Sequence, residues 1–207
     1  MEVKCIYGGL AGNNSYIVIN NSNADDTHRC VVIDPAMPYV YDEVQSMRLN
    51  VEAVLLTHGH FDHIAGVKPF LDARVPIYIH EGDKGKCTGL DMLEYLNYYG
   101  IEPFTPTNLI TCEGDLHLAG FDIQVMETPG HSKGSVCYII DNVIFSGDTL
   151  FAGSYGVYHF SDGDFALLKN SIVNKLFKLE GDYKVYSGHG EVTTIDKEKG
   201  GNMILWS

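Results

Sequence analysis

The chain has 207 residues, 45% of them hydrophobic and 20% charged, which suffices for one globular domain with a sizeable core. Its formal net charge is −13, with 14 Lys and Arg against 27 Asp and Glu, and this argues against a nucleic-acid partner because phosphate contacts need basic side chains. No apolar stretch approaches the roughly 18 residues of a membrane span, and no secretory signal pattern is present. The five cysteines are widely spread. We therefore expect a cytoplasmic protein with reduced cysteines and no membrane partner.

Short apolar or alternating runs predict strands, in chain order Val3–Tyr7, Ser15–Ile19, Cys30–Asp34, Ala53–Leu56, Ile77–Ile79, Leu116–Leu118, Phe121–Met126, Ser135–Ile140, Val143–Ser146 and Lys184–Ser187. Apolar residues at helical spacing predict helices over Tyr39–Leu49, Ile64–Leu71, the stretch around Asp91–Tyr98, Phe165–Phe177 and Ile195–Lys199. Turn residues predict hairpins at 20–26, at Ala119-Gly120 and at Asp141-Asn142. Two strand-rich halves that each end in helices indicate an α/β protein with sheets between helices, folded as a single domain over residues 1–207.

A dense group of metal-ligating side chains directly follows the predicted strand Ala53–Leu56. His58, His60, Asp62 and His63 lie within six residues. Imidazole nitrogens and carboxylate oxygens suit zinc, iron and manganese. His58 and His60 point the same way in an extended segment, whereas Asp62 and His63 follow the beginning of a turn. One ion needs only three protein ligands plus water, so four candidates this close indicate two ions.

Three further candidate ligands follow other predicted strands. They are His131, Asp148 and His189, and each has a glycine beside it that allows close backbone packing. Strand ends that converge on one edge of a pair of sheets are expected places for sites. The sequence therefore predicts that these three side chains join the first group.

Four motifs in this order carry a family resemblance: Thr57-His58-Gly59-His60-Phe61-Asp62-His63, Thr128-Pro129-Gly130-His131-Ser132, Ser146-Gly147-Asp148-Thr149-Leu150-Phe151-Ala152-Gly153 and Gly188-His189-Gly190. The chain resembles the metallo-β-lactamase-fold hydrolases, and within them the short, single-domain members of the glyoxalase II (hydroxyacylglutathione hydrolase) branch. The resemblance implies a four-layer αβ/βα sandwich with a site for two divalent ions, zinc first and iron or manganese as alternatives. It also implies the division of the ligands: His58, His60 and His131 hold one ion, Asp62, His63 and His189 hold the other, and Asp148 bridges them.

The expected chemistry is hydrolysis of a thioester in a small-molecule substrate by a hydroxide that bridges the ions. Asp62 is the candidate catalytic residue, orienting the hydroxide and passing on its proton. Candidate substrate contacts are Lys133, Tyr155 and Tyr158. The sequence differs from the short relatives at Val157, where those have an arginine. The resemblance therefore does not imply that the chain recognises glutathione. The oligomeric state is left open.

Two other readings stay open. The same site is compatible with another ester, a lactone, a β-lactam or a phosphodiester as substrate. A protein that binds metal without catalysis is the alternative from a different class.

Overall fold

The computed structural model describes residues 1–21 and 28–207. Most of the predicted loop at 20–26 therefore lies outside the described residues. The strands on either side of it pair antiparallel, with Asn20 opposite Arg29, as the predicted hairpin requires.

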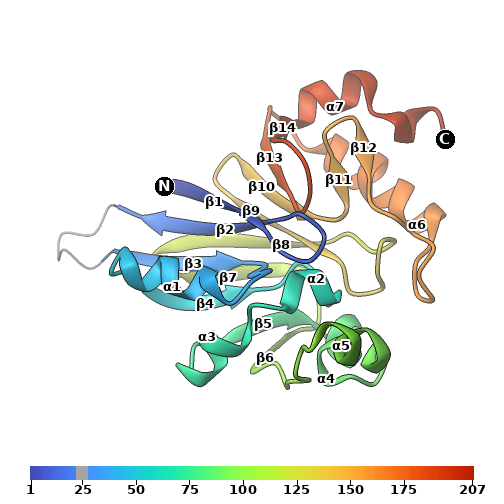
Figure 1. Ribbon diagram of the computed structural model, residues 1–207. Coiled ribbons are helices and arrows are strands. Elements are labelled where there is room, and N and C mark those ends of the chain that lie inside the picture. The colour runs from blue at the N-terminus through green and yellow to red at the C-terminus, as the bar shows by residue number, and fades with distance from the viewer. Residues whose placement is uncertain (22–27) are drawn as a thin grey trace.

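Two mixed sheets make up the body of the protein (Figure 1). The first has the spatial order β1 (Glu2–Gly8), β2 (Asn13–Asn20), β3 (Arg29–Ile33), β4 (Asn50–Leu55), β5 (Ile77–His80) and β6 (Asn108–Ile110). The second has the order β14 (Thr193–Thr194), β13 (Lys184–Ser187), β10 (Val143–Gly147), β9 (Val136–Ile140), β8 (Phe121–Glu127) and β7 (Gly114–Leu118). A small hairpin is formed by β11 (Leu150–Phe151) and β12 (Ser154–Tyr155).

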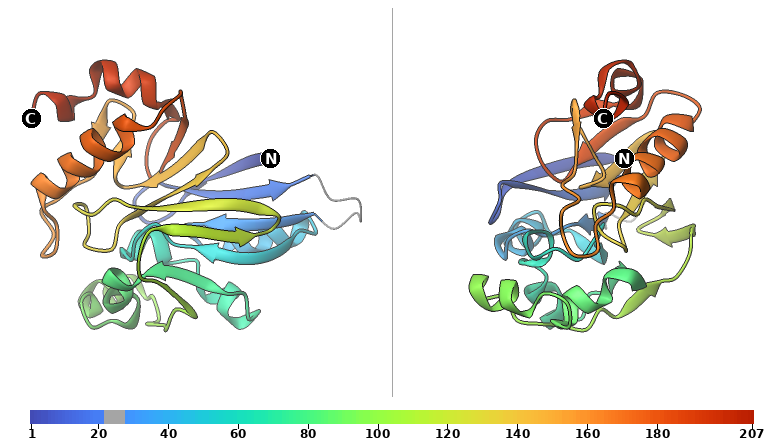
Figure 2. Two further views of the ribbon diagram at one scale, coloured as in Figure 1. Left: turned by 180° about the vertical axis from the view of Figure 1, so that it is seen from behind. Right: turned by 90° about the vertical axis from the view of Figure 1, so that its right-hand side faces the viewer.

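Helices cover both outer faces of the paired sheets, as the two views in Figure 2 show. The helices beside the first sheet are α1 (Tyr39–Ser46), α2 (Phe61–Ile64), α3 (Lys68–Asp72), α4 (Lys84–Thr88) and α5 (Leu93–Tyr99). Those beside the second are α6 (Phe165–Asn170) and α7 (Ile195–Gly201). The layers are therefore helix, sheet, sheet and helix, which confirms the predicted four-layer sandwich. None of the described helices is long and apolar enough to cross a bilayer.

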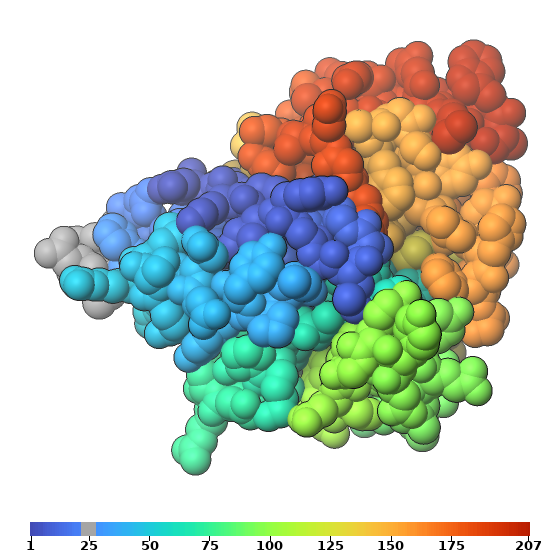
Figure 3. Space-filling view, in the orientation of Figure 1, coloured from blue at the N-terminus to red at the C-terminus, as the bar shows by residue number. Residues whose placement is uncertain are grey.

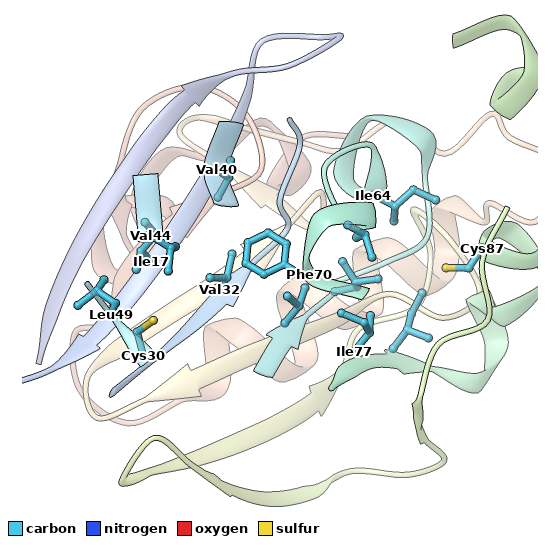
Figure 4. Packing of buried hydrophobic residues seen from close by; sticks show 14 of the residues in the cluster. Ile17, Cys30, Val32, Val40, Val44, Leu49, Ile64, Phe70, Ile77 and Cys87 are labelled. Atoms are coloured by element: carbon cyan, nitrogen blue, oxygen red, sulfur yellow. The ribbon is translucent and has the colours of Figure 1, made fainter. Parts of the chain in front are cut away.

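Successive side chains of a strand point to opposite faces of the sheet, so one strand contributes to two hydrophobic cores. In β2, Tyr16 and Val18 pack between the sheets, whereas Ile17 and Ile19 pack under the helices of the first sheet. In that outer core Phe70 of α3 lies among side chains of the sheet and of α1 (Figure 4). The burial of such side chains stabilises each helix layer by roughly 1.5–3 kcal/mol per large residue.

Two predicted helices are interrupted. The helix expected over Ile64–Leu71 is divided into α2 and α3, because the backbone N–H of Gly66 donates to the Pro35 carbonyl oxygen at 2.8 Å and so leaves the helical hydrogen-bond pattern. Gly66 also packs closely on Met37, where a Cβ atom would lie 2.3 Å from the Met37 carbonyl oxygen. The segment predicted as Phe165–Phe177 begins as α6 and continues as a π-helical turn over Ser171–Lys175 and a 3-10 turn over Leu176–Lys178. The tight turn at Ala119-Gly120 is confirmed, with φ of 54° and 75°.

Candidate metal centre

All seven predicted ligands lie together where strands of both sheets end. The segment that follows β4 supplies four of them, and segments that follow β8, β10 and β13 supply His131, Asp148 and His189. Figure 3 shows the surface hollowed where the blue N-terminal segment, the green α4–α5 segment and the orange segment around β11 and β12 meet. The site is therefore assembled from both halves of the sandwich.

Three buried imidazoles form the first group. The Nδ1 atom of His60 lies 2.8 Å from Nε2 of His131, which lies 3.1 Å from Nε2 of His58. The three side chains are at most 3% exposed. Such close approach of ring nitrogens places three lone-pair positions around one point, which is the arrangement of a three-histidine metal site.

The second group contains Asp62, His63 and His189. The Oδ2 atom of Asp62 lies 3.5 Å from Nε2 of His189 and 3.8 Å from Nε2 of His63. Asp148 faces both groups, because its Oδ1 lies 3.3 Å from His63 Nε2 and its Oδ2 lies 3.6 Å from His131 Nε2. Its position between the groups matches the bridging ligand that the resemblance implies.

Nε2 of His63 and Oδ1 of Asp148 are buried and lie 3.3 Å apart, but they do not meet in hydrogen-bond geometry. Neither atom has another hydrogen-bond partner among the described residues. Burying an unpartnered polar atom costs about 1–3 kcal/mol, so an unexplained pair at one point indicates a missing partner. An imidazole nitrogen and a carboxylate oxygen are both ligands for zinc, iron and manganese. The residues present therefore fit divalent metal ions.

Neighbouring groups orient the rings so that the ligating nitrogens face inward. His63 donates from Nδ1 to Oδ2 of Asp34 at 2.9 Å, and Thr57 Oγ1 donates to the same oxygen at 2.6 Å. His131 donates from Nδ1 to the carbonyl oxygen of Val157. Such outer partners fix the tautomer and ring orientation of metal ligands. Asp34 is a functional residue that the sequence did not single out, although it ends the third predicted strand next to Pro35.

The electrostatics of the site separate the two groups of side chains. Burial lowers the pKa of His58, His60 and His131, that of His60 to about 3, so these rings are neutral. Burial also acts to lower the pKa of His189, but Asp148 and Asp62 outweigh it and raise this pKa to about 9.

The two carboxylates of the site stay ionised. Burial acts to raise the pKa of Asp62 and Asp148, yet the charge of His63 and hydrogen bonds with His189 hold both pKa values below their usual range. Neutral imidazoles and ionised carboxylates are the forms that bind metal.

A cavity of about 570 Å³ opens beside His60. Its lining includes Lys133, His159 and Phe160, and the Phe160 ring lies 4.4 Å from the His60 ring between centroids. The volume falls in the range of small-molecule sites.

Two predicted substrate contacts lie elsewhere. Tyr155 and Tyr158 are not among the lining residues of this cavity. Their rings pack against Phe165 of α6, with centroid distances of 5.9 and 4.9 Å. The Tyr155 hydroxyl forms a hydrogen bond with Oγ of Ser207. The two rings thus pack on α6, and their neighbours His159 and Phe160 line the cavity. That Tyr155 and Tyr158 contact substrate stays a prediction.

A family model described as the metallo-beta-lactamase superfamily matches residues 8–189. The chain belongs to this superfamily, and it is a metal-binding hydrolase by class. It is 34% identical to the hydroxyacylglutathione hydrolase GloC of Haemophilus influenzae over 190 residues, which cover 87% of this chain and 89% of the relative. It is 32% identical to the probable metallo-hydrolase YqgX of Bacillus subtilis, with 93% and 92% of the two chains covered.

Solved structures agree with the fold. The crystal structure of the BLEG-1 B3 metallo-beta-lactamase matches with a TM-score of 0.88 and 34% identity over 100% of both chains. The structure of TTHA1623 in a di-iron-bound form matches with a TM-score of 0.80 and 32% identity over 96% and 98%. The predicted metallo-β-lactamase fold is thus confirmed.

Proposed function

We propose that the chain is a hydrolase with two divalent ions that acts on thioesters. His58, His60 and His131 hold one ion, Asp62, His63 and His189 hold the other, and Asp148 contacts both. The observation that carries this proposal is the convergence of these seven side chains around the unpartnered atoms His63 Nε2 and Asp148 Oδ1. The similarity to GloC supports the choice of thioester.

Two bound ions would supply a water of lowered pKa and would stabilise negative charge on the carbonyl oxygen under attack. Around them, Asp62 is placed to accept a proton, because it is ionised and its Oδ2 faces the centre of the site. Phe160 covers His60 and keeps water from one side. The chain's own contribution is thus to hold the ligands, receive the proton and limit the access of solvent.

Lys133 is the residue that we propose for recognition of an anionic group on the substrate. It lines the cavity, and within the described ranges 1–21 and 28–207 no acidic side chain pairs with its ammonium. The other lysine of the cavity, Lys86, is bound by Asp83 at 3.0 Å and by Asp162 at 2.5 Å. The ammonium of Lys133 can therefore pair with an anionic group of the substrate, whereas that of Lys86 is already paired with two carboxylates.

A substitution tests this role. Lys133→Met should raise the KM for a thioester with a carboxylate on its leaving group by about fivefold, the scale of an exposed ion pair, and should leave a neutral thioester unaffected. Lys84→Met, at an exposed position of α4, is the matched control. An equal rise in KM for both thioesters would show that Lys133 does not recognise the carboxylate.

The function itself is tested by counting metal in the purified protein and assaying S-lactoylglutathione beside lactone, β-lactam and phosphodiester panels. We expect about two ions per chain and the highest kcat/KM with the thioester. Two ions with no turnover on any panel would favour a protein that binds metal without catalysis. One ion with oxygen consumption would point to a dioxygenase and end the proposal.

β-Lactam hydrolysis is the second candidate, because a matching structure with complete coverage of both chains is that of a B3 metallo-beta-lactamase. A chromogenic cephalosporin separates the two, since hydrolysis faster than that of the thioester would favour this candidate. For the metal we propose zinc, with iron and manganese as alternatives that the same ligands accept. Because all five cysteines are free, we propose a cytoplasmic location.

A further inference from the structure

Asn13 lies against the second metal group, although it is 49 positions from Asp62 and 176 positions from His189 in the sequence. It opens β2 directly after the glycine-rich turn at residues 8–12, and its side chain is only 1% exposed. An isolated β-bridge pairs its backbone with His189. The start of β2 is thereby fixed beside the loop that carries this ligand.

The side-chain amide of Asn13 faces two proposed ligands at once. Its Nδ2 atom donates to Oδ2 of Asp62 at 3.0 Å and lies 3.4 Å from Nε2 of His189. The Oδ1 atom accepts from the backbone N–H of Ala11 at 3.3 Å, which sets the direction of the amide. The donor end of Asn13 therefore points to the ligands, and the acceptor end points to the glycine-rich turn.

The neighbouring residue Asn14 makes hydrogen bonds to backbone atoms instead. Asn14 donates from Nδ2 to the carbonyl oxygens of Ser187 and Gly190, and its backbone N–H donates to Gly188. These bonds hold the backbone of the His189 loop and do not reach the ligating atoms. Asn13 is thus the member of this pair whose side chain acts on the ligand side chains themselves.

We infer that Asn13 is a positioning residue for the second ion, holding Asp62 and His189 in the orientation in which they bind it. A carboxylate with a fixed donor on one oxygen loses rotational freedom, and loss of such an outer partner costs about 10–100-fold in metal affinity. Asn13 supplies the donor without charge, whereas an acid here would add a third carboxylate beside Asp62 and Asp148. This inference rests on the two-ion part of the proposed function.

The test measures metal binding and needs no substrate. Asn13→Ala and Asn13→Leu both remove the amide donor, and the leucine also keeps most of the side-chain volume. Chelator-treated protein is titrated with Zn²⁺ by calorimetry in the presence of a competing chelator, and bound metal is counted by mass spectrometry. We expect both variants to bind the first ion with unchanged affinity and the second about 10–100-fold more weakly.

Asn20→Ala is the matched control, because Asn20 lies at the other end of the same strand and is 4% exposed. Its Nδ2 donates to the carbonyl oxygen of Ala119 at 2.8 Å, so the control also removes a buried amide donor, far from the ligands. It should lower the Tm and leave both metal affinities unchanged.

The outcomes separate this inference from the proposed function. Two ions bound with wild-type affinity by both Asn13 variants, or equal weakening of both ions, would overturn the role of Asn13 alone. The same would follow if Asn20→Ala weakened the second ion as much as the Asn13 variants do. A wild-type protein that binds a single ion would overturn the two-ion function and this inference together.

Discussion

Asp62 combines two properties within one side chain: it faces His63 and His189 as a proposed metal ligand, and its pKa is held low enough to leave it ionised. A proton acceptor has to be a base, whereas a ligand needs only an oxygen. Asparagine keeps an oxygen of similar position and loses the basicity, so the two properties can be separated by one substitution.

We predict that Asp62→Asn retains about two ions and lowers kcat by about 10²–10⁴-fold, the usual range for loss of a general base. Metal counting and steady-state kinetics on the best substrate of the panel measure the two effects. Asp72→Asn, on the exposed side of α3, is the control. Full activity would exclude the proton-transfer role, and parallel loss of metal and activity would leave Asp62 as a ligand only.

Some residues of the site could be predicted from the sequence, and others could not. The seven candidate ligands could be predicted from their residue types and from their positions after strands. Asp34 and Asn13 could not, because each acts across the fold on a partner 29 or 49 positions away in sequence. A single Asp or Asn carries no local sign of such a partner. Only the pairing of β2, β3 and β4 brings these side chains to the ligands.

Among the elements, the segment after β12 depends on a charge pair for its position. Asp162 binds the ammonium of Lys86 at 2.5 Å and accepts from the backbone N–H of Lys133 at 3.0 Å. Lys86 is 4% exposed and also bound by Asp83, which accepts further hydrogen bonds from Gly59, Ser132 and Gly134. The wall of the cavity that carries Phe160 is thereby connected to α4 and to the loops that carry His58 and His131.

This tie predicts a pH dependence of stability. Burial acts to raise the pKa of Asp162, but the Lys133 N–H and Lys86 outweigh it and lower that pKa. A carboxyl with a depressed folded-state pKa stabilises the fold above its unfolded pKa of about 4 and loses this contribution as the pH falls through the folded value. Asp162→Asn should thus cost about 1–2 kcal/mol at pH 7 and progressively less in acid.

Urea unfolding of the chelator-treated protein at a series of pH values measures this difference. The buried histidines other than His60 titrate in both proteins and cancel when the variant is subtracted from the wild type. His60 does not cancel, because its charge acts on Asp162. Asp72→Asn breaks an exposed pair with Lys68 and should stay within about 0.5 kcal/mol at every pH. A cost of Asp162→Asn that does not change between pH 7 and acid would contradict the ionic origin of the tie.

Element boundaries were less predictable than element existence. Periodicity correctly indicated a helical segment after Asp164, with Leu168, Ile172 and Leu176 buried, but it did not reveal the π-helical turn at Ser171–Lys175. The short strand β6 was missed because three residues show no pattern, and its place is set by parallel pairing with β5. Tertiary packing decides both features.

At the scale of the whole molecule, the proposed ions connect the two halves of the sandwich. His58, His60, Asp62 and His63 belong to the first sheet's side, whereas His131, Asp148 and His189 follow strands of the second. Each proposed ion has ligands from both sides. Metal binding should therefore hold the sheets together in addition to supplying chemistry, and it should relieve the unpartnered His63 Nε2 and Asp148 Oδ1.

We predict that chelation lowers the Tm and that Zn²⁺ restores it. An ion at 100 times its Kd stabilises the folded state by about 2.7 kcal/mol per site, and about 2–4 °C per kcal/mol is expected for a chain of this size. The expected shift is thus about 5–10 °C per ion, measured by calorimetry at fixed protein concentration.

Mg²⁺ is the control, since it prefers oxygen ligands and should restore little at a site with five imidazoles. An unchanged Tm after complete metal removal would show that the ions do not couple the halves, because a ligand that binds only the folded state must stabilise it.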